Sequence, residues 1–400
     1  MKVGLVTFAY PINRNYYWIG VERSVEAFAK ALVKEGIEVT VFCSKINGVA
    51  QKENNDENLK ILQTNSISKG ILNLNLISFT FYTYRKYFEE LKKQDIIHIF
   101  ASSHFPIFKN KFNKIITHVF HEPILSDQSF PLLIQTMYQR AYNYFLYKLS
   151  DVISVEYLPG TYEWNELIKI YNLRNDKVIF SPVEGVDLNV FNDKVECKDI
   201  VEKYGNDYIL AVGPFRVDKG YNYMIRAIPL VIKEVKDAHF LFVGSTKNID
   251  YLFNLINRLG IKDKITFTGF VHDNMLPKFY RAAKFLVFPA LREGMPLIPL
   301  EAMACGTPVI SSDLPITRYE LGNAGIFVKP RDPNAIAKAI IELLNDDNLR
   351  KELSRRGLER VKKFTWENCA KNWIKLYQKI LNEDEEFKKS YNSSYSPYLE

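Results

Sequence analysis

The chain has 400 residues, of which 47% are apolar and 25% are charged, and its formal net charge is +7. This length exceeds the size at which one hydrophobic core usually stops growing, so it predicts two globular domains and excludes a wholly disordered chain. The basic residues are spread along the whole sequence without a recognition motif, so we expect no nucleic-acid partner. No apolar run reaches the ~18 residues that a membrane-spanning helix needs.

The cysteines and the first residues indicate the setting of the protein. Cys43, Cys197, Cys305 and Cys369 lack the close paired spacing of metal or redox sites, which favours a reduced compartment. The opening MKVGLVTFAY has one lysine before a short apolar run, which fits a buried strand better than a signal peptide. We therefore expect a cytoplasmic protein, either soluble or peripheral on the inner face of the membrane.

Apolar strands and amphipathic helices alternate along the chain, which predicts parallel sheets covered by helices on both faces. The expected elements of the first half are strands at 3–8, 39–43, 96–100 and 115–120 and a helix at 22–35. In the second half they are strands at 208–213, 239–244, 265–268 and 285–288 and a last helix at 366–381. Two such series predict an α/β protein with two Rossmann-like, doubly wound domains.

The stretch EGMPLIPLEAMACGTPVI, residues 293–310, is typical of a loop that turns into a helix. Pro299 favours a first helical turn, and Gly306 can end the helix in a left-handed conformation. Glu293 then lies just before the helix N-terminus, where exposed amides and the helix dipole suit a phosphate, and Glu301 lies below it. A nucleoside diphosphate sugar fits this arrangement. The alternative is two solvated glutamates beside an ordinary helix.

The letters EG at 293–294, PLEAMA at 299–304 and GTPVI at 306–310 resemble the donor-site motif of retaining glycosyltransferases of family four, the glycosyl transferases group 1. The likeness covers the chain from the first strand to about Leu381. It implies the GT-B architecture, in which two Rossmann-like domains face an interdomain cleft. The chain departs from the family's Glu-Gly-Phe-Gly-Leu at Pro296, which has no N–H for a phosphate.

The resemblance also implies roles for individual residues of this motif. Glu293 orients the transferred sugar, and Glu301 accepts hydrogen bonds from the ribose. Gly294, Met295 and Leu297 complete the donor-binding loop.

The stretch GPFRVDKG, residues 213–220, follows the strand that opens the second domain. A fixed cation there stabilises the negative charge that builds on a leaving phosphate. Lys219 matches the family's Lys-Gly, whereas Pro214 stands where the family has arginine, so Arg216 is the candidate substitute. The alternative for Lys219 is a solvated surface lysine.

Two positions of the first domain complete the predicted site. Gly20, in the turn GVER, resembles the glycine that lets the backbone approach the donor, although Ile19 replaces the family's first glycine. His121 follows a strand at the edge where doubly wound folds bind ligands, and the resemblance implies contact with the donor sugar. The alternatives are a plain helix start and a structural histidine. We expect His118, on the other face, to be core.

The resemblance also divides the chain. Residues 1–185 form the N-terminal, acceptor-side domain, 186–206 a linker and 207–365 the donor domain, and the helix 366–381 packs back onto the first domain. The charged, serine-rich tail at 383–400 is predicted to be disordered.

The predicted activity is that of a hexosyltransferase that moves a sugar from a nucleoside diphosphate sugar to a glycan or lipid-linked acceptor. Retention is implied by the resemblance, and His121, Glu293 and Lys219 are the catalytic candidates. No Asp-x-Asp triplet occurs, so we expect no metal and no cofactor beyond the donor substrate.

Two other functions stay open. A non-catalytic sugar-nucleotide-binding subunit of the same fold is one, because Ile19, Pro214 and Pro296 depart from the family. A nicotinamide-dependent oxidoreductase is the other, although the Gly-x-Gly-x-x-Gly turn that it needs is missing after the first strand.

Residues 69–115 combine aromatic side chains with cations and predict a surface that could contact anionic lipid. The alternative is a helix with a buried aromatic face and a solvated basic one. The cations are Lys69, Arg85, Lys86, Lys92, Lys93, Lys109, Lys111 and Lys114.

Overall fold

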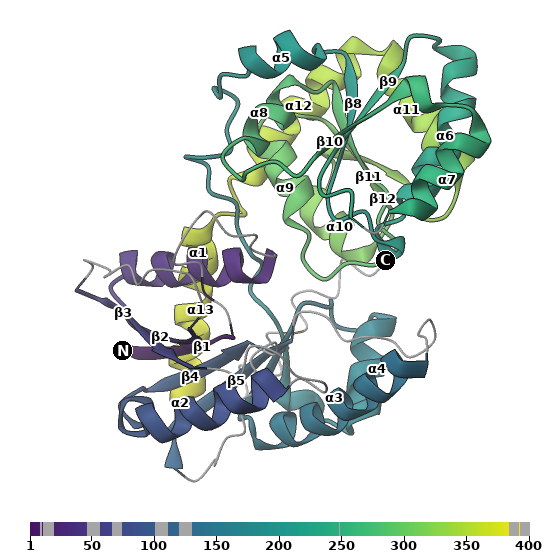
Figure 1. Cartoon of the computed structure of the whole chain (residues 1–400). Coiled ribbons are helices and arrows are strands. Elements are labelled where there is room, and N and C mark those ends of the chain that lie inside the picture. The colour runs from purple at the N-terminus through teal and green to yellow at the C-terminus, as the bar shows by residue number, and fades with distance from the viewer. Residues whose placement is uncertain are drawn as a thin grey trace. The chain divides into compact units, whose positions relative to one another are not determined.

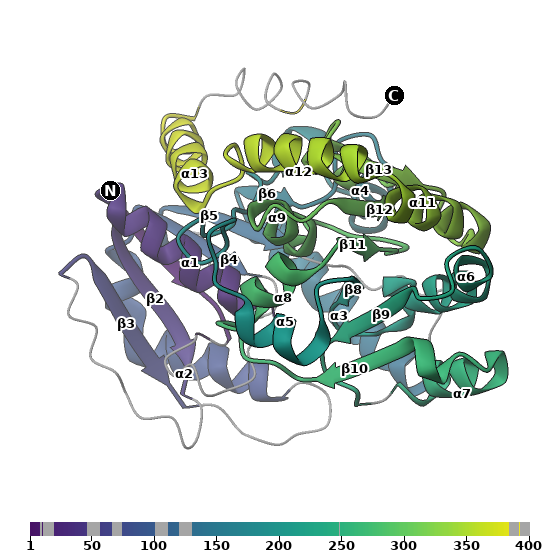
Figure 2. The same ribbon diagram turned by 90° about the horizontal axis from the view of Figure 1, so that it is seen from above.

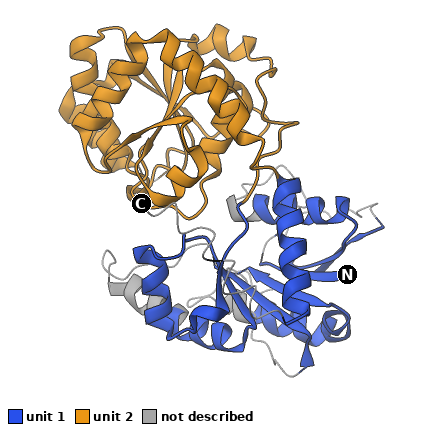
Figure 3. Ribbon diagram, turned by 180° about the vertical axis from the view of Figure 1, so that it is seen from behind, with its two compact units in different colours: residues 1–183, 366–400 blue, residues 184–365 orange. Residues whose placement is uncertain are grey.

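The computed structural model describes residues 1–8, 10, 20–45, 57–65, 74–100, 111–119, 130–247, 249–383 and 392 (Figure 1). The chain forms two units, residues 1–183 with 366–400 and residues 184–365 (Figure 3). Each unit has its own parallel sheet.

Unit 1 is built on seven parallel strands in the order β3-β2-β1-β4-β5-β6-β7. The strands are β1 (Lys2–Val6), β2 (Glu38–Ser44), β3 (Leu59–Thr64), β4 (Ile96–Phe100), β5 (Lys114–Val119), β6 (Val152–Val155) and β7 (Val178–Phe180). The helices are α1 (Gly20–Lys34), α2 (Leu74–Lys92), α3 (Phe130–Leu149), α4 (Tyr162–Tyr171) and α13 (Trp366–Leu381), with a 3₁₀ turn at Asn175–Lys177. Helices α1 and α13 pack together on one face of the sheet, and α2 and α3 lie on the other (Figures 1 and 2).

The returning helix α13 belongs to the core of unit 1. Trp373 and Tyr377 are buried, and the ring of Trp373 meets that of Phe28 on α1 at 5.9 Å. The hydroxyl of Tyr377 lies 2.7 Å from Nδ1 of His98, a buried residue of β4. The last helix thus covers a sheet face that the first part of the chain leaves only partly filled by α1.

Unit 2 is built on six parallel strands in the order β10-β9-β8-β11-β12-β13. The strands are β8 (Tyr208–Val212), β9 (His239–Val243), β10 (Ile265–Gly269), β11 (Phe285–Phe288), β12 (Val309–Ser312) and β13 (Gly325–Val328). The helices are α5 (Lys198–Tyr204), α6 (Tyr221–Glu234), α7 (Asp250–Leu259), α8 (Leu276–Ala282), α9 (Leu297–Ala304), α10 (Pro315–Leu321), α11 (Pro333–Asn345) and α12 (Asp347–Val361), with 3₁₀ turns at Val217–Lys219 and Lys262–Lys264.

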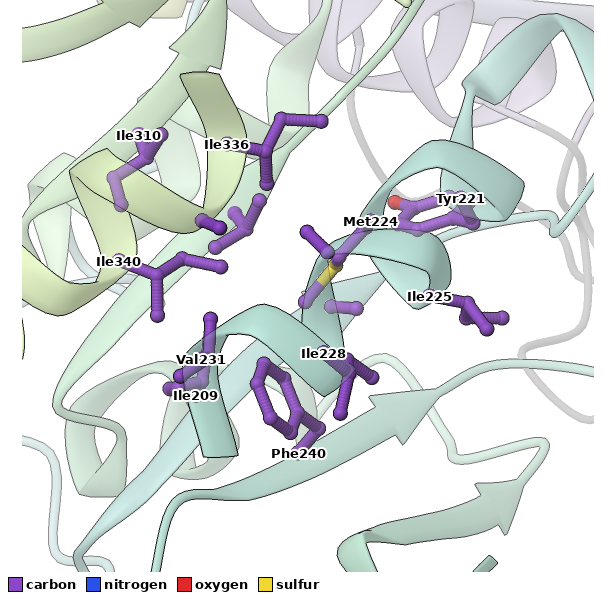
Figure 4. Close-up of a cluster of buried hydrophobic side chains, with 14 of the residues drawn as sticks. Ile209, Tyr221, Met224, Ile225, Ile228, Val231, Phe240, Ile310, Ile336 and Ile340 are labelled. Atoms are coloured by element: carbon purple, nitrogen blue, oxygen red, sulfur yellow. The ribbon is translucent and has the colours of Figure 1, made fainter. Parts of the chain in front are cut away.

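The core of unit 2 lies between the sheet and helices α6 and α11 (Figure 4). Ile228 and Val231 of α6 and Ile340 of α11 are fully buried there, together with Phe240 and Ile310 of the sheet. Helices α8, α9 and α12 cover the other face (Figure 1). Strands covered on both faces need long apolar runs, which is why the sequence shows them clearly.

The strand order confirms the predicted fold class of two doubly wound, Rossmann-like units. In each unit the order reverses beside the first strand, between β1 and β4 in unit 1 and between β8 and β11 in unit 2. The loops that follow these strands diverge there, so a ligand can enter at the carboxyl edge of the sheet.

Residues 186–206, where the sequence predicts a linker, are part of unit 2. Phe191 is buried and its ring meets that of Tyr280 at 6.1 Å, and Ile200 of α5 is also buried. Buried apolar side chains hold this segment against the unit, which begins at Glu184.

Most of the predicted disordered tail lies outside the described residues, and Asn392 is an exception. Its side-chain amide donates to the carbonyl oxygen of Val178 at 2.7 Å, and its side-chain oxygen accepts from the amide of Phe180 at 3.1 Å. Asn392 thus pairs with β7, the edge strand of unit 1. Across the described parts of the chain, no helix is both long and apolar enough to cross a membrane.

Candidate functional site

The predicted site residues of unit 2 meet at the carboxyl edge of its sheet, where the strand order reverses. Arg216 and Lys219 lie on the loop after β8, and Glu293 lies on the loop after β11. Because β8 and β11 are neighbours in the sheet, these two loops lie side by side. Helix α9 begins a few residues after Glu293, at Leu297.

Lys219 and Glu293 form a buried ion pair, with the ammonium 2.6 Å from Oε1 of the carboxylate. Their side chains are only 14% and 9% exposed. Burial raises the pKa of Glu293, and the charge of Lys219 acts against this shift. The ammonium of Lys219 has three N–H donors, and the carboxylate of Glu293 has two acceptor oxygens. The pair uses one donor and one oxygen, so both groups can form further hydrogen bonds to a ligand.

The two loops are locked together by backbone contacts. The amide of Leu291 donates to the carbonyl oxygen of Asp218 at 2.9 Å. Gly220 has a φ of 69°, and a Cβ at this position would collide with the carbonyl oxygen of Pro289. Only glycine therefore allows this close approach, which places Lys219 opposite Glu293.

Arg216 does not stand alone, because Asp218 binds it through two hydrogen bonds. Nε of Arg216 lies 2.9 Å from Oδ1, and Nη2 lies 2.6 Å from Oδ2. Sequence reasoning missed Asp218, although the Arg-x-Asp spacing is a signal for such a fork. The Arg216 side chain is 57% exposed, and its guanidinium has further N–H groups, so it can still bind an anion from solvent.

Helix α9 begins at Leu297, with Pro296 as its N-cap and Pro299 in its first turn, as the sequence predicts. The missing N–H of Pro296 thus lies before the helix. Of the four N–H groups that a helix start leaves without an intrahelical partner, two are missing, because the N-cap Pro296 and the third helical residue Pro299 have none; Leu297 and Ile298 supply the other two. The helix end ought therefore to attract an anion despite the departure from the family motif.

The end of α9 and the loop before the helix complete the motif. Gly306 has a φ of 74° and follows the end of α9 in the left-handed conformation, as predicted. Gly294 and Met295 are buried between Glu293 and the helix, and Leu297 is partly exposed.

Glu301, the fifth residue of α9, is 4% exposed, and its Oε2 accepts a hydrogen bond of 2.8 Å from the hydroxyl of Tyr280. Tyr280 is fully buried on α8. Burial, with the negative charge of Glu301, raises the pKa of the Tyr280 phenol well above its usual value. The phenol therefore keeps its proton and donates. Nothing in the sequence pairs these residues, so Tyr280 was missed.

A second missed carboxyl is that of Glu320 on α10, which is fully buried. Neither of its oxygens has a hydrogen-bond partner within the described ranges. Burial raises its pKa well above the usual value, and the charge of Glu293 adds to the shift. The guanidinium of Arg360 donates to the backbone carbonyl of Glu320 at 2.8 Å. Glu320 thus keeps its proton to a higher pH than an exposed glutamate does.

In unit 1, Gly20 is the first residue of α1, and His121 lies outside the described residues. His118 on β5 is buried, with Nε2 3.5 Å from Oε1 of Glu156 and Nδ1 3.3 Å from Oγ of Ser154. Burial lowers its pKa to about 3, so it is a neutral core residue, as the sequence predicts. In the described part of the chain, no three His, Cys, Asp or Glu side chains gather to hold a metal ion.

The protein is a two-domain α/β protein with two Rossmann-like units. In unit 2, the N-terminus of α9 and the Lys219–Glu293 ion pair lie where the strand order reverses. Residues 194–360 match the family model described as glycosyl transferases group 1, and residues 18–179 match the model described as glycosyltransferase family 4. The chain belongs to the group 1 glycosyltransferases and has the GT-B fold.

Relatives and solved structures agree with this assignment. O-antigen chain mannosyltransferase B of Escherichia coli is 30% identical over 219 residues, which are 54% of this chain and 58% of that protein. O-antigen chain mannosyltransferase RfbU of Salmonella typhimurium is 33% identical over 215 residues, 52% of this chain and 57% of that protein. The chain thus spans a little over half the length of these relatives.

Among solved structures, sucrose-phosphate synthase from Thermosynechococcus elongatus has a TM-score of 0.77 at 20% identity, covering 96% of this chain and 100% of that one. HepE of Anabaena, in complex with UDP and glucose, has a TM-score of 0.68 at 15% identity, and the match covers 94% of this chain and 99% of that one. At these identities the likeness concerns the fold.

Lys219→Met should expose the dependence of the two loops on their ion pair. The variant leaves the Glu293 charge buried without its partner, which typically costs about 3–5 kcal/mol of unfolding free energy. We expect Glu293→Gln in the same chain to recover a large part of this loss. Urea unfolding of the four proteins of this cycle measures the coupling.

The exposed pair of Lys278 and Asp199, 2.9 Å apart in the same unit, is the control. Lys278→Met should cost much less, because solvent screens that pair. Strictly additive losses for Lys219→Met and Glu293→Gln would show that their side chains do not interact.

Glu320→Gln should stabilise the protein, and only at higher pH. The folded chain keeps a proton on Glu320 that the unfolded chain releases above about pH 4.5, so the unfolding free energy falls by up to ~1.4 kcal/mol per pH unit until the folded-state pKa is reached. Glutamine has no proton to release, so the unfolding free energy of the variant does not fall with pH in this way. We expect a higher melting temperature for the variant at about pH 7 and none of this gain at about pH 4.

Glu352 provides a control of opposite sign, because hydrogen bonds from Arg355 and then Arg356 lower its pKa to about 2. That carboxylate stabilises the fold above its unfolded pKa, and the effect is lost as pH falls through about 2. Glu352→Gln should therefore lower the melting temperature near neutral pH. A Glu320→Gln variant with a pH profile parallel to that of the wild type would mean that Glu320 is ionised in the folded chain.

Proposed function

We propose that this protein is a glycosyltransferase that moves a sugar from a nucleoside diphosphate sugar to a glycan or lipid-linked acceptor, with retention of anomeric configuration. The observation that carries the proposal is the buried pair of Lys219 and Glu293 beside the N-terminus of α9. A cation, a carboxylate and free amides at one switch point match a pyrophosphate joined to a polyhydroxyl sugar. The names of the mannosyltransferase relatives and the UDP and glucose complex of HepE support this substrate class.

In this proposal unit 2 is the donor domain. The pyrophosphate lies at the amides of α9 and is contacted by Lys219 and Arg216, and Glu301 accepts hydrogen bonds from the ribose. Glu293 orients the transferred sugar, and Gly294, Met295 and Leu297 line the donor. Unit 1 serves the acceptor side, with Gly20 and His121 approaching the donor sugar.

The ion pair explains how Lys219 would favour the transition state. Negative charge builds on the leaving phosphate as the glycosyl bond breaks, so an ammonium that is already held in place stabilises the transition state more than the ground state. Glu293 binds that ammonium through one carboxylate oxygen, and its other oxygen can accept a hydrogen bond from a sugar hydroxyl.

Retention follows if the acceptor attacks the face that the leaving group vacates. The bond between the anomeric carbon and the phosphate oxygen breaks, and a bond to the acceptor oxygen forms on the same side. The acceptor's proton passes to the leaving phosphate. This route needs no protein nucleophile, and we propose that it needs no metal.

Release of nucleoside diphosphate tests the activity. GDP-mannose and UDP-glucose are offered with membrane-derived glycan and lipid-linked acceptors in EDTA, and proton NMR reads the anomeric configuration of the product. We expect turnover with one donor, retention, and a loss of at least about a hundredfold in kcat for Lys219→Met, as for other single transition-state contacts.

Lys278→Met, which removes an exposed cation of the same unit, should keep wild-type turnover. Donor binding without turnover on any acceptor would favour the non-catalytic subunit instead. An inverted product would contradict the proposed attack, and loss of all turnover in EDTA would contradict metal independence.

We also propose that unit 1 contacts an anionic membrane surface through helices α2 and α3. Phe81 and Tyr82 on α2 are 58% and 41% exposed, and Tyr144 and Phe145 on α3 are 41% and 66% exposed. Arg85 and Lys86 are exposed on the same helix as the first pair. Exposed aromatic rings beside cations suit the interface of an anionic bilayer.

Three further cations of residues 69–115, Lys92, Lys93 and Lys114, form ion pairs within the protein, and the ammonium of Lys86 lies 3.4 Å from the carbonyl oxygen of Gln63. Lys92 and Lys93 pair with Glu89 and Glu90 at 3.3 and 3.0 Å. Lys114 pairs with Glu383 at 2.7 Å. The surface thus depends on the exposed rings more than on net charge.

Vesicle flotation tests this contact. We expect binding to vesicles with phosphatidylglycerol, weakening with salt, and a loss of binding for the double variant Phe81→Ser and Phe145→Ser. Phe253→Ser in unit 2, where the phenylalanine is 36% exposed, is the control. Equal flotation of both variants would show that these helices are not the contact surface.

A further inference from the structure

The buried hydroxyl of Tyr280 contacts the carboxylate that we assign to the donor ribose. We infer that Tyr280 is a positioning residue, whose hydrogen bond fixes the carboxylate of Glu301 in the orientation that receives the ribose hydroxyls. This inference rests on the proposed function. It adds a residue from outside the donor-site motif, because Tyr280 lies on α8, whereas the motif lies on α9 and the loop before it.

The contact has the features of a strong, directional bond. The donor and acceptor are 2.8 Å apart, with Tyr280 fully buried and Glu301 only 4% exposed. A hydrogen bond to an ionised carboxylate is about twice as strong as one between neutral groups, and exclusion of water strengthens it further. Because the phenol keeps its proton, it acts as a hydrogen-bond donor toward Glu301.

A carboxylate that accepts one hydrogen bond can accept others as well. Two carboxylate oxygens offer about four acceptor positions, and Tyr280 occupies one of them on Oε2. The terminal torsion of a glutamate is broad and has no sharp preferred rotamer, so a carboxylate without such a bond must be ordered when the ligand binds. Tyr280 removes this ordering cost before the donor arrives.

Tyr280 is itself held from a second element. Oγ1 of Thr307, just after α9, donates to the backbone carbonyl of Tyr280 at 2.7 Å. This carbonyl lies in the last turn of α8, where it also accepts a hydrogen bond of 3.1 Å from the amide of the C-cap residue Ala283. The ring of Phe191 packs against the phenol ring with centroids 6.1 Å apart. The backbone and the ring are therefore both fixed, which aims the hydroxyl at Glu301.

Tyr208 provides a matched control within the same unit. It is also a buried tyrosine, 1% exposed, and its hydroxyl donates a hydrogen bond of 2.8 Å, to the carbonyl of Phe279. It begins β8, at the amino edge of the sheet, whereas the candidate site lies at the carboxyl edge. Tyr280→Phe and Tyr208→Phe thus remove the same atom and one hydrogen bond each, and only the first touches Glu301.

The test separates ribose recognition from general destabilisation. Calorimetry first finds which of UDP, GDP and ADP binds the wild-type protein, and then compares that nucleotide with its 2′,3′-dideoxy analogue. We expect Tyr280→Phe to weaken the ribonucleotide about tenfold, the size of one hydrogen bond to a charged group. It should weaken the dideoxy analogue less than about twofold. Tyr208→Phe should leave both affinities unchanged, although both variants lower the melting temperature.

Three results would overturn the inference. Wild-type affinity of Tyr280→Phe for the ribonucleotide would show that the bond does not prepare Glu301. Equal weakening of the ribonucleotide and the dideoxy analogue would show a general loss of structure rather than a positioning role. Absence of binding of all three nucleotides to the wild-type protein would contradict the proposed function itself, and the inference with it.

Discussion

The buried ion pair of Lys219 and Glu293 is the interaction on which the site depends. Removing two charges from water costs several kcal/mol for each ion, and only close geometry with further hydrogen bonds offsets that cost. The strand order meets this condition, because β8 and β11 are neighbours and send their loops to the same edge of the sheet. Gly220, which has no side chain to hit Pro289, lets the two loops close. The pair therefore depends on topology and on one glycine as much as on its own charges.

Around this pair the site is organised as two carboxylates with different supports. Glu293 is held by a cation, and Glu301 is held by the neutral phenol of Tyr280. In the proposed reaction the charged partner faces the phosphate, where charge changes, and the neutral partner stands behind the ribose, where it does not. In this proposal Glu293 acts on the chemistry and Glu301 on recognition of the donor.

Much of the fold could be predicted, since strands buried on both faces show as unbroken apolar runs. Strands 96–100 and 285–288 and helix 366–381 have the predicted bounds. Strand β3 escaped prediction, because an edge strand with polar residues such as Lys60 and Gln63 lacks that pattern. The polar composition of residues 186–206 predicts a linker, because it gives no sign that Phe191 is buried.

The site could be predicted only as a set of residues. Motif spacing proposes Lys219, Glu293 and Glu301 as site residues, yet it does not show that the first two form an ion pair. Partners such as Tyr280 come from other elements of the chain, and only the packing of α8 against α9 brings it to Glu301. Glu320 gave no signal because it occupies a position in α10 that would suit an apolar side chain. Motif spacing along the chain does not predict contacts between elements that are far apart in the sequence.

A crystal structure of the protein with the nucleoside diphosphate that binds best would show whether the Lys219–Glu293 pair and the start of α9 hold the donor. We predict phosphate oxygens within hydrogen-bond distance of the Leu297 and Ile298 amides and of the Lys219 ammonium, with the ribose hydroxyls bound to Glu301. Phosphates bound elsewhere, with Lys219 and Glu293 still joined only to each other, would contradict this prediction.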